Sequence, residues 1–304
     1  MIYLIIGVLL SSLVTILFKV ADRLRLNSDN LILVNYLLAA VVSGVLCGQA
    51  GLYAGLPARL MSADISTLLT AKTPGNTCFL LMIVGLFSGV YYIVDLFNTK
   101  SSVIYNGATL TALFGKFGFL ISTFTAAIVW KEIPTGLQFI GILLAIAGIL
   151  LASGGLKNAG GAKKPLLLAA LVLTGGLMEI NGKCAVYYTM EGFDSLYVSV
   201  IFTTAFLLCV AHTARTCIRT GTRFTISWRD IAGGIILGLP NVAGSYLALM
   251  AMQTVPANIY FPTNAVGNLV VVSLAGMLLF REKTNAMQKL AIVVTVVSLT
   301  LLNL

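Results

Sequence analysis

The sequence has few charged residues and almost no histidine. Of its 304 residues only 10% are Asp, Glu, Lys or Arg, one is histidine, and 59% are hydrophobic. A soluble domain of this length could not bury so much apolar surface, and no polar stretch is long enough to form a separate soluble domain. The scarcity of charge therefore excludes a soluble protein and predicts an all-α integral membrane domain.

Motifs for catalysis and metal binding are also missing. The chain contains no Gly-x-Ser-x-Gly sequence and no His-Glu metal motif. Its five cysteines are odd in number and show no metal-ligand spacing; they are Cys47, Cys78, Cys184, Cys209 and Cys217. We therefore expect no enzymatic activity, no cofactor, no metal and no disulfide framework. The net charge of +9 comes from short loops rather than from a basic face, so we expect no nucleic-acid partner.

Long apolar runs are what the sequence does contain. Ten runs are long enough to cross a bilayer, near 2–20, 30–48, 77–98, 102–129, 135–153, 165–189, 195–214, 230–251, 256–280 and 286–303. The longest connection, 49–76, is rich in Gly, Pro, Ser and Thr and suits an exposed loop with room for a short interfacial helix. A Gly- and Lys-rich loop, 154–164, separates a first repeat, 1–153, from a second, 165–304.

Short motifs recur in the two halves. The recurring residues are Trp130-Lys131-Glu132 with Gln138, and Phe280-Arg281-Glu282 with Gln288, at equal spacing. Near the start of each half, Lys19 and Lys183 form a second echo. Because a unit of five helices is odd in number, a second copy enters the membrane from the opposite face. We therefore predict two inverted five-helix repeats around a central cavity.

The distribution of Lys and Arg predicts the orientation. One face receives Arg23, Arg25, Lys100, Lys157, Lys163, Lys164, Arg215, Arg219, Arg223, Arg229, Arg281, Lys283 and Lys289, and the other receives Arg59, Lys72 and Lys131. The more basic face is expected in the cytoplasm, which places both termini outside it. The predicted location is the plasma (inner) membrane, as a multi-pass protein.

The ten runs and the paired glutamate motifs resemble the drug/metabolite transporter superfamily, in its EamA-like branch. Two motifs carry the resemblance: Trp130-Lys131-Glu132-Ile133-Pro134 with Gln138 and Gly141, and Phe280-Arg281-Glu282 with Gln288. In the second motif Thr284 stands at the place of Pro134, and Ala291 at that of Gly141. The resemblance implies inverted repeats that move small polar metabolites by alternating access. We expect Glu132 and Glu282 to serve structure, each at the positive end of the helix that follows it.

Polar side chains inside the apolar runs are the candidates for a binding site. An ionisable group in hydrocarbon costs roughly 2.5 to 3.5 kcal/mol, so it marks a cavity or a partner. Glu179 and Lys183 share one helix face, and Gly175 and Gly176, one turn before Glu179, permit close helix packing. The predicted substrate-binding residues are Lys19, Tyr91, Tyr92, Asp95, Asn98, Lys116, Glu179, Asn181, Lys183, Asn241, Asn264 and Asn268.

Structural roles compete with binding for several of these residues. Lys19 and Asp95 lie close to helix ends on one face, where snorkelling or an ion pair explains them equally well. Lys183 could neutralise the acid one turn earlier on its own helix. Asn264 and Asn268 could form hydrogen bonds between helices.

The mixture of lysines and acids in the apolar runs favours a ligand that carries a carboxylate or a phosphate, including zwitterions such as amino acids. We therefore predict a secondary transporter for such a metabolite, working by exchange or by proton coupling. Glu179 is the first candidate for the proton carrier and Asp95 the second. A lipid flippase and a small-multidrug-type exporter are the alternatives. The expected partners are the substrate and the lipid bilayer, with the chain as a monomer or homodimer; substrate identity and transport direction stay open.

Overall fold

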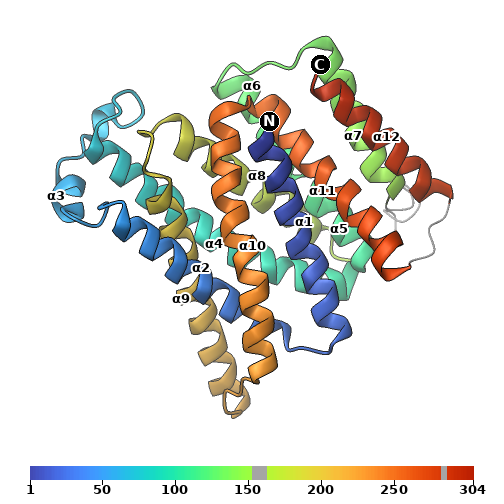
Figure 1. Cartoon of the computed structure of the whole chain (residues 1–304), viewed down its shortest axis with the longest axis horizontal. Helices are drawn as coiled ribbons and strands as arrows, with labels where there is room; N and C mark the ends of the chain where they lie inside the picture. The colour runs from blue at the N-terminus through green and yellow to red at the C-terminus, as the bar shows by residue number, and fades with distance from the viewer. Residues whose placement is uncertain (153–162, 282–285) are drawn as a thin grey trace. The chain divides into compact units, whose positions relative to one another are not determined.

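The computed structural model describes residues 1–152, 163–281 and 286–304, and in these residues the regular elements are helices (Figure 1). They are α1 (Ile2–Arg23), α2 (Ser28–Gln49), α3 (Leu56–Met61), the 3-10 helix η1 (Ile65–Thr67), α4 (Pro74–Asn106), α5 (Ala108–Lys116), α6 (Gly118–Val129), α7 (Gly136–Ala152), α8 (Pro165–Tyr187), α9 (Asp194–Thr220), α10 (Trp228–Thr254), α11 (Ala257–Phe280) and α12 (Ala286–Leu302). The predicted loop 154–164, apart from its last two residues, and Glu282 lie outside the described residues.

Eight spans of these helices are long and apolar enough to cross a membrane, and the all-helical prediction is confirmed for the described residues. The spans are α1, α2, α4, Leu110–Val129, α8, α9, α10 and α11. Two more helices, α7 and α12, are apolar but only 17 residues long. The ten predicted runs thus coincide with eight spans and two shorter helices.

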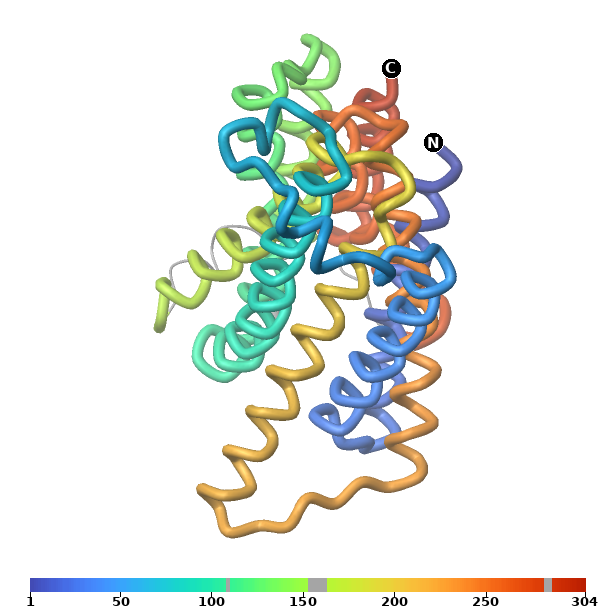
Figure 2. The backbone as a smooth tube through the Cα atoms, turned by 90° about the vertical axis from the view of Figure 1, so that its left-hand side faces the viewer, coloured from blue at the N-terminus to red at the C-terminus, as the bar shows by residue number. Residues whose placement is uncertain are grey.

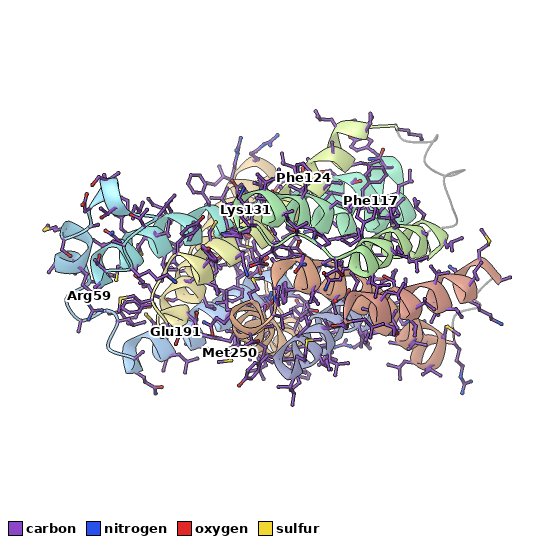
Figure 3. All side chains as sticks on the ribbon, turned by 90° about the horizontal axis from the view of Figure 1, so that it is seen from above. Arg59, Phe117, Phe124, Lys131, Glu191 and Met250 are labelled. Atoms are coloured by element: carbon purple, nitrogen blue, oxygen red, sulfur yellow. The ribbon has the colours of Figure 1, made fainter. Side chains whose placement is uncertain are left out.

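The boundary between the third and fourth predicted runs is wrong. The sequence predicted a break near 98–102, but α4 continues to Asn106 and has 33 residues. The break falls at Gly107, whose φ of 83° lies in a region that side chains with a Cβ rarely adopt. A second interruption, at Phe117, divides α5 from α6. In Figure 3, Phe117 and Lys131 mark the start and the end of the α6 segment.

The chain forms two compact units, and each takes segments from both halves of the sequence. Unit 1 contains 1–12, 94–180 and 254–304; unit 2 contains 13–93 and 181–253. Four long helices contribute residues to both units: α1, α4 and α8, and α10 through its last residue, Thr254.

In unit 1 the last helices of the two halves, α7 and α12, pack side by side and antiparallel (Figure 1). The Ser298 hydroxyl donates a hydrogen bond to the carbonyl oxygen of Gly141 at 2.7 Å. At the other end, a Cβ on Gly148 would lie 3.6 Å from the carbonyl oxygen of Ala291. Small residues therefore let the two backbones approach closely, as is usual where apolar helices associate in membranes.

The glutamate of the motif before α7 contacts the N-terminus of another helix, α11, which the sequence did not predict. The Glu132 carboxylate accepts a hydrogen bond from the backbone N–H of Ala257, the first residue of α11. At the start of α7, Thr135 and Gln138 form a reciprocal capping box with bonds of 3.0 and 3.3 Å. Gln138 also accepts a hydrogen bond from Asn258 of α11 at 3.0 Å, so the motif joins two helix N-termini.

Unit 2 is built around α2 and α9, the second helices of the two halves. Glycines of α10 pack against α2: a Cβ on Gly234 would lie 2.5 Å from Val34, and one on Gly238 would lie 3.2 Å from the carbonyl oxygen of Asn35. At the N-termini of both helices, Asn30 donates a hydrogen bond to Asp230 at 3.0 Å. The α9–α10 connection, 221–227, is an extended segment that Figure 2 shows at the bottom of the tube.

Candidate functional site

The middle of α8 lies against α6 because glycines line both faces. A Cβ on Gly118 would lie 2.8 Å from the backbone nitrogen of Gly176, and a Cβ on Gly176 would lie 2.9 Å from the carbonyl oxygen of Gly118. The prediction that glycines allow close packing here is confirmed. One turn further along each helix, the Ser122 hydroxyl donates a hydrogen bond to the Glu179 carboxylate. The glycine contact therefore sets the register of α6 against α8, and this register places Ser122 beside Glu179.

Lys116 lies at the end of α5, inside the span Leu110–Val129, and is partly buried. Its ammonium group donates a hydrogen bond to Asn268 Oδ1 of α11 at 2.8 Å. The amide nitrogen of Asn268 donates in turn to the Ser11 hydroxyl of α1 at 3.1 Å, and Ser11 donates to the carbonyl oxygen of Val8 at 3.0 Å. This chain of donors fixes the orientation of the Asn268 amide, with its oxygen toward the cation.

Asp95 brings a second carboxylate into unit 1. It accepts a hydrogen bond from the Thr174 hydroxyl of α8 at 2.6 Å. The Lys116 ammonium interacts electrostatically with both Asp95 and Glu179. One cation therefore interacts with two carboxylates, and the three groups together carry a charge of −1 when all are ionised.

We call these residues the unit 1 polar cluster: Ser11, Asp95, Lys116, Ser122, Thr174, Glu179 and Asn268. Four of them, Asp95, Lys116, Glu179 and Asn268, were predicted from the sequence, and the structure brings them together. The other three are short hydroxyl side chains, which are common in membrane helices and carry no distinctive signal. Their spacing offered a clue, because Ser122 follows Gly118 by one turn and Thr174 comes directly before the glycine pair.

Among the described residues of unit 1, two more hydroxyls are buried without a hydrogen-bond partner. They belong to Thr123 of α6 and Thr263 of α11, with exposed fractions of 6% and 9%. These helices pack against each other. A buried polar group without a partner is unusual and calls for water or a ligand. Asn98 of α4 and Asn264 of α11 also belong to unit 1, and both are partly buried.

The remaining predicted site residues lie in unit 2, and several make contacts between helices. Asn181 donates a hydrogen bond to Ser88 at 3.1 Å, and Asn241 donates one to Asn35 at 3.0 Å. The ring of Tyr92 packs edge-on against two other aromatic rings, and that of Tyr91 stacks on a third. Lys183 is 5% exposed, whereas Lys19 is partly exposed.

The unit 1 polar cluster is suited to charge recognition and proton exchange. The Ser122 hydroxyl has two acceptors, the Glu179 carboxylate and the carbonyl oxygen of Phe119 at 3.0 Å. The Thr174 hydroxyl likewise lies 2.9 Å from the carbonyl oxygen of Ala170 while bonding Asp95. Because a hydroxyl has one proton, each can turn from carboxylate to backbone when the carboxylate becomes protonated. In the described residues, no group of His, Cys, Asp and Glu could hold a metal ion.

Comparison with known proteins bears on the fold only. No protein-family model and no curated protein matches the chain. A crystal structure whose description gives no function is similar to the chain, with a TM-score of 0.68 and 14% identity over 99% of this chain and 94% of that one. Likeness at this identity extends to the whole fold but carries no information about substrate.

Proposed function

We propose that the chain is a multi-pass secondary transporter of the plasma membrane, which moves a small anionic or zwitterionic metabolite by alternating access. The observation that carries the proposal is a lysine inside a membrane-length apolar span, which donates a hydrogen bond to an asparagine of another helix and interacts electrostatically with two carboxylates. Ionisable groups at such positions usually form substrate sites or proton pathways. The ten apolar helices and the paired motifs favour an EamA-like drug/metabolite transporter.

Contacts in unit 1 support an inverted repeat. In the register set by Glu132 and Glu282, Gly141 corresponds to Ala291 and Gly148 to Ser298. The observed contacts join Gly141 with Ser298 and Gly148 with Ala291, so each contact is the counterpart of the other. Reciprocal pairing of this kind is typical of a two-fold axis between equivalent elements.

The backbone before each motif glutamate supports the same relation. Lys131 and Arg281 both adopt a left-handed conformation, with φ of 59° and 51°. Among the described residues only one other non-glycine residue, Arg25, does so. Such a conformation is uncommon for a side chain with a Cβ, so its recurrence at equivalent places favours a common ancestor of the two halves.

In this proposal Lys116 binds the acidic group of the substrate, and Glu179 carries the proton, with Asp95 as the alternative carrier. A bound carboxylate or phosphate would bring another negative charge to a cluster that already holds two carboxylates. Protonation of one carboxylate would offset that charge, which couples proton uptake to substrate binding. The unpartnered hydroxyls of Thr123 and Thr263 offer hydrogen bonds for the neutral part of the substrate.

A ligand screen tests the proposal. The purified protein is heated with amino acids, organic acids, sugars and nucleotides in turn, and its unfolding temperature is recorded. A ligand at 100 times its Kd should stabilise the fold by about 2.7 kcal/mol. We expect ligands with a carboxylate or phosphate to do so, Lys116→Met to abolish the effect, and Lys289→Met, an exposed control, to retain it.

Hits from the screen are then tested for counterflow in proteoliposomes. Exchange of labelled for unlabelled ligand supports a carrier. Stabilisation by phospholipid headgroups alone, abolished by Lys116→Met, would favour a flippase, and stabilisation by hydrophobic cations alone would favour a multidrug exporter. Either result would contradict the proposed substrate class.

A further inference from the structure

The C-terminal end of α9, the connection to α10 and the first two residues of α10 form a strongly basic, exposed surface. Between Asp194 and Asp230 the chain has four arginines and no acidic residue. All four, Arg215, Arg219, Arg223 and Arg229, are exposed. We call this surface the α9–α10 basic hairpin. It lies in unit 2, outside the unit 1 polar cluster, and transport as proposed above makes no use of it.

Large apolar side chains accompany these arginines. Ile218 and Trp228 are 82% and 77% exposed, and Phe224 is also exposed. Isolated exposed apolar residues are ordinary, but Trp and Phe among arginines are typical of segments at the boundary between headgroups and acyl chains. Trp228 is followed directly by Arg229, so an apolar ring and a cation lie side by side in the sequence.

The helix α9 is longer than the hydrocarbon core of a bilayer requires. Its 27 residues span about 40 Å, whereas the hydrocarbon core of a bilayer is about 30 Å thick. The excess of roughly two turns begins near Arg215 if the apolar part of the helix fills the core. A guanidinium group offers a planar fork of donors that matches a phosphate, and it is less strongly hydrated than an ammonium group.

We propose that the α9–α10 basic hairpin binds the phosphate headgroups of anionic phospholipids, with Trp228 and Phe224 inserted at the acyl-chain boundary. Basic residues beside a membrane span are attracted to anionic lipid, and four of them act together here. The inference depends on the membrane location of the chain, not on its transport activity.

Trp228 provides a direct test, because the chain has only one other tryptophan, Trp130, which is buried. The full chain carrying Trp130→Phe is reconstituted in phosphatidylcholine vesicles with a minor fraction of brominated lipid, either phosphatidylglycerol or phosphatidylcholine. We expect brominated phosphatidylglycerol to be enriched at Trp228 by roughly fivefold or more, seen as stronger fluorescence quenching. The wild-type chain is measured in parallel, where the fluorescence of Trp130 contributes equally to the measurements with the two lipids.

Two charge-matched variants complete the experiment. Replacement of the four hairpin arginines by glutamine should remove the preference for phosphatidylglycerol. Replacement of Arg23, Arg25, Lys163 and Lys164 by glutamine, an equal change in net charge, should leave it intact. Equal quenching by the two lipids in the wild type, loss of the preference in the control variant, or its abolition by millimolar inorganic phosphate would each overturn the proposal. None of these readouts depends on transport.

Discussion

At the scale of single residues, Asn268 fixes the cation of the unit 1 polar cluster. Its amide oxygen accepts from Lys116 and its amide nitrogen donates to Ser11, so one side chain joins α1, α5 and α11. The side chain is 6% exposed, and such a site leaves little freedom to the ammonium group that it holds.

Replacement of Asn268 by alanine should therefore weaken substrate binding. A hydrogen bond to a charged group contributes about 1.5 to 3 kcal/mol, and the ammonium group would also lose its preferred direction. We expect the Kd of the stabilising ligand to rise about tenfold or more, measured by titration of the unfolding temperature. Ser273→Ala, which changes a partly buried polar residue further along α11, is the control and should change the Kd by much less. Equal losses in the two variants would indicate a general packing defect of α11.

Glu179 supplies a second prediction at this scale. Glutamine keeps an acceptor for the Ser122 hydroxyl but cannot bind a proton. Glu179→Gln should therefore retain exchange of labelled for unlabelled substrate while losing accumulation driven by a pH gradient, as measured in proteoliposomes. Glu191→Gln, a change of the same kind in an exposed loop, should behave as wild type. Full accumulation and full pH dependence in Glu179→Gln would show that the proton is carried elsewhere, and Asp95→Asn would be tested next.

At the scale of elements, the contact between α6 and α8 determines the site. Gly118 and Gly176 bring the backbones together, and the bond from Ser122 to Glu179 follows one turn later. Because the contact is between backbones, a methyl group added at Gly118 could not be accommodated by the movement of a side chain. The two helices would have to move apart.

Gly118→Ala should consequently destabilise the protein by about 1 to 3 kcal/mol, the usual cost of overpacking. It should also weaken substrate binding, because α6 and α8 must separate. Gly115→Ala is a close control: no atom lies within 4 Å of a Cβ at that position, and alanine favours a helix more than glycine does. Thermal unfolding in detergent would compare the two. If both variants unfolded at the wild-type temperature, the two helices would have more room than the backbone distances allow.

The sequence predicts the positions of helices better than it predicts which residues contact one another. Apolar runs locate the helices because their length is imposed by the bilayer, and charged residues within those runs identify Asp95, Lys116 and Glu179. The boundary near 98–102 was misplaced because the polar residues there lie within α4, while the helix ends at Gly107. The target of Glu132 was also missed, since its partner Ala257 is 125 residues away and no local pattern encodes that pairing.

At the scale of the whole molecule, orientation is the property that the charge distribution predicts most directly. The face that receives the α9–α10 basic hairpin also receives most other loop Lys and Arg residues. Positively charged loops are retained in the cytoplasm, so both termini should lie outside it.

A pair of reporter fusions measures this orientation. A reporter active only outside the cytoplasm should be active at Leu304 and inactive when inserted after Gly221, in the α9–α10 connection. The opposite pattern would reverse the predicted topology. Activity at both sites would show that both lie on the same side of the membrane, so that an even number of helices crosses it between them. Both fusions leave the helices themselves unchanged.

The pairing of α7 with α12 has a consequence for how such a chain is assembled. Each helix offers a face of small residues, and each face is covered by the corresponding helix of the other half. In a half produced alone, that face would contact lipid. A face of glycine and serine packs closely only against the matching face of the other half. Residues 1–152 and 163–304, produced as separate chains, should therefore associate in the membrane. The covalent link between the halves would then keep them close together, but it would not determine which helices pair.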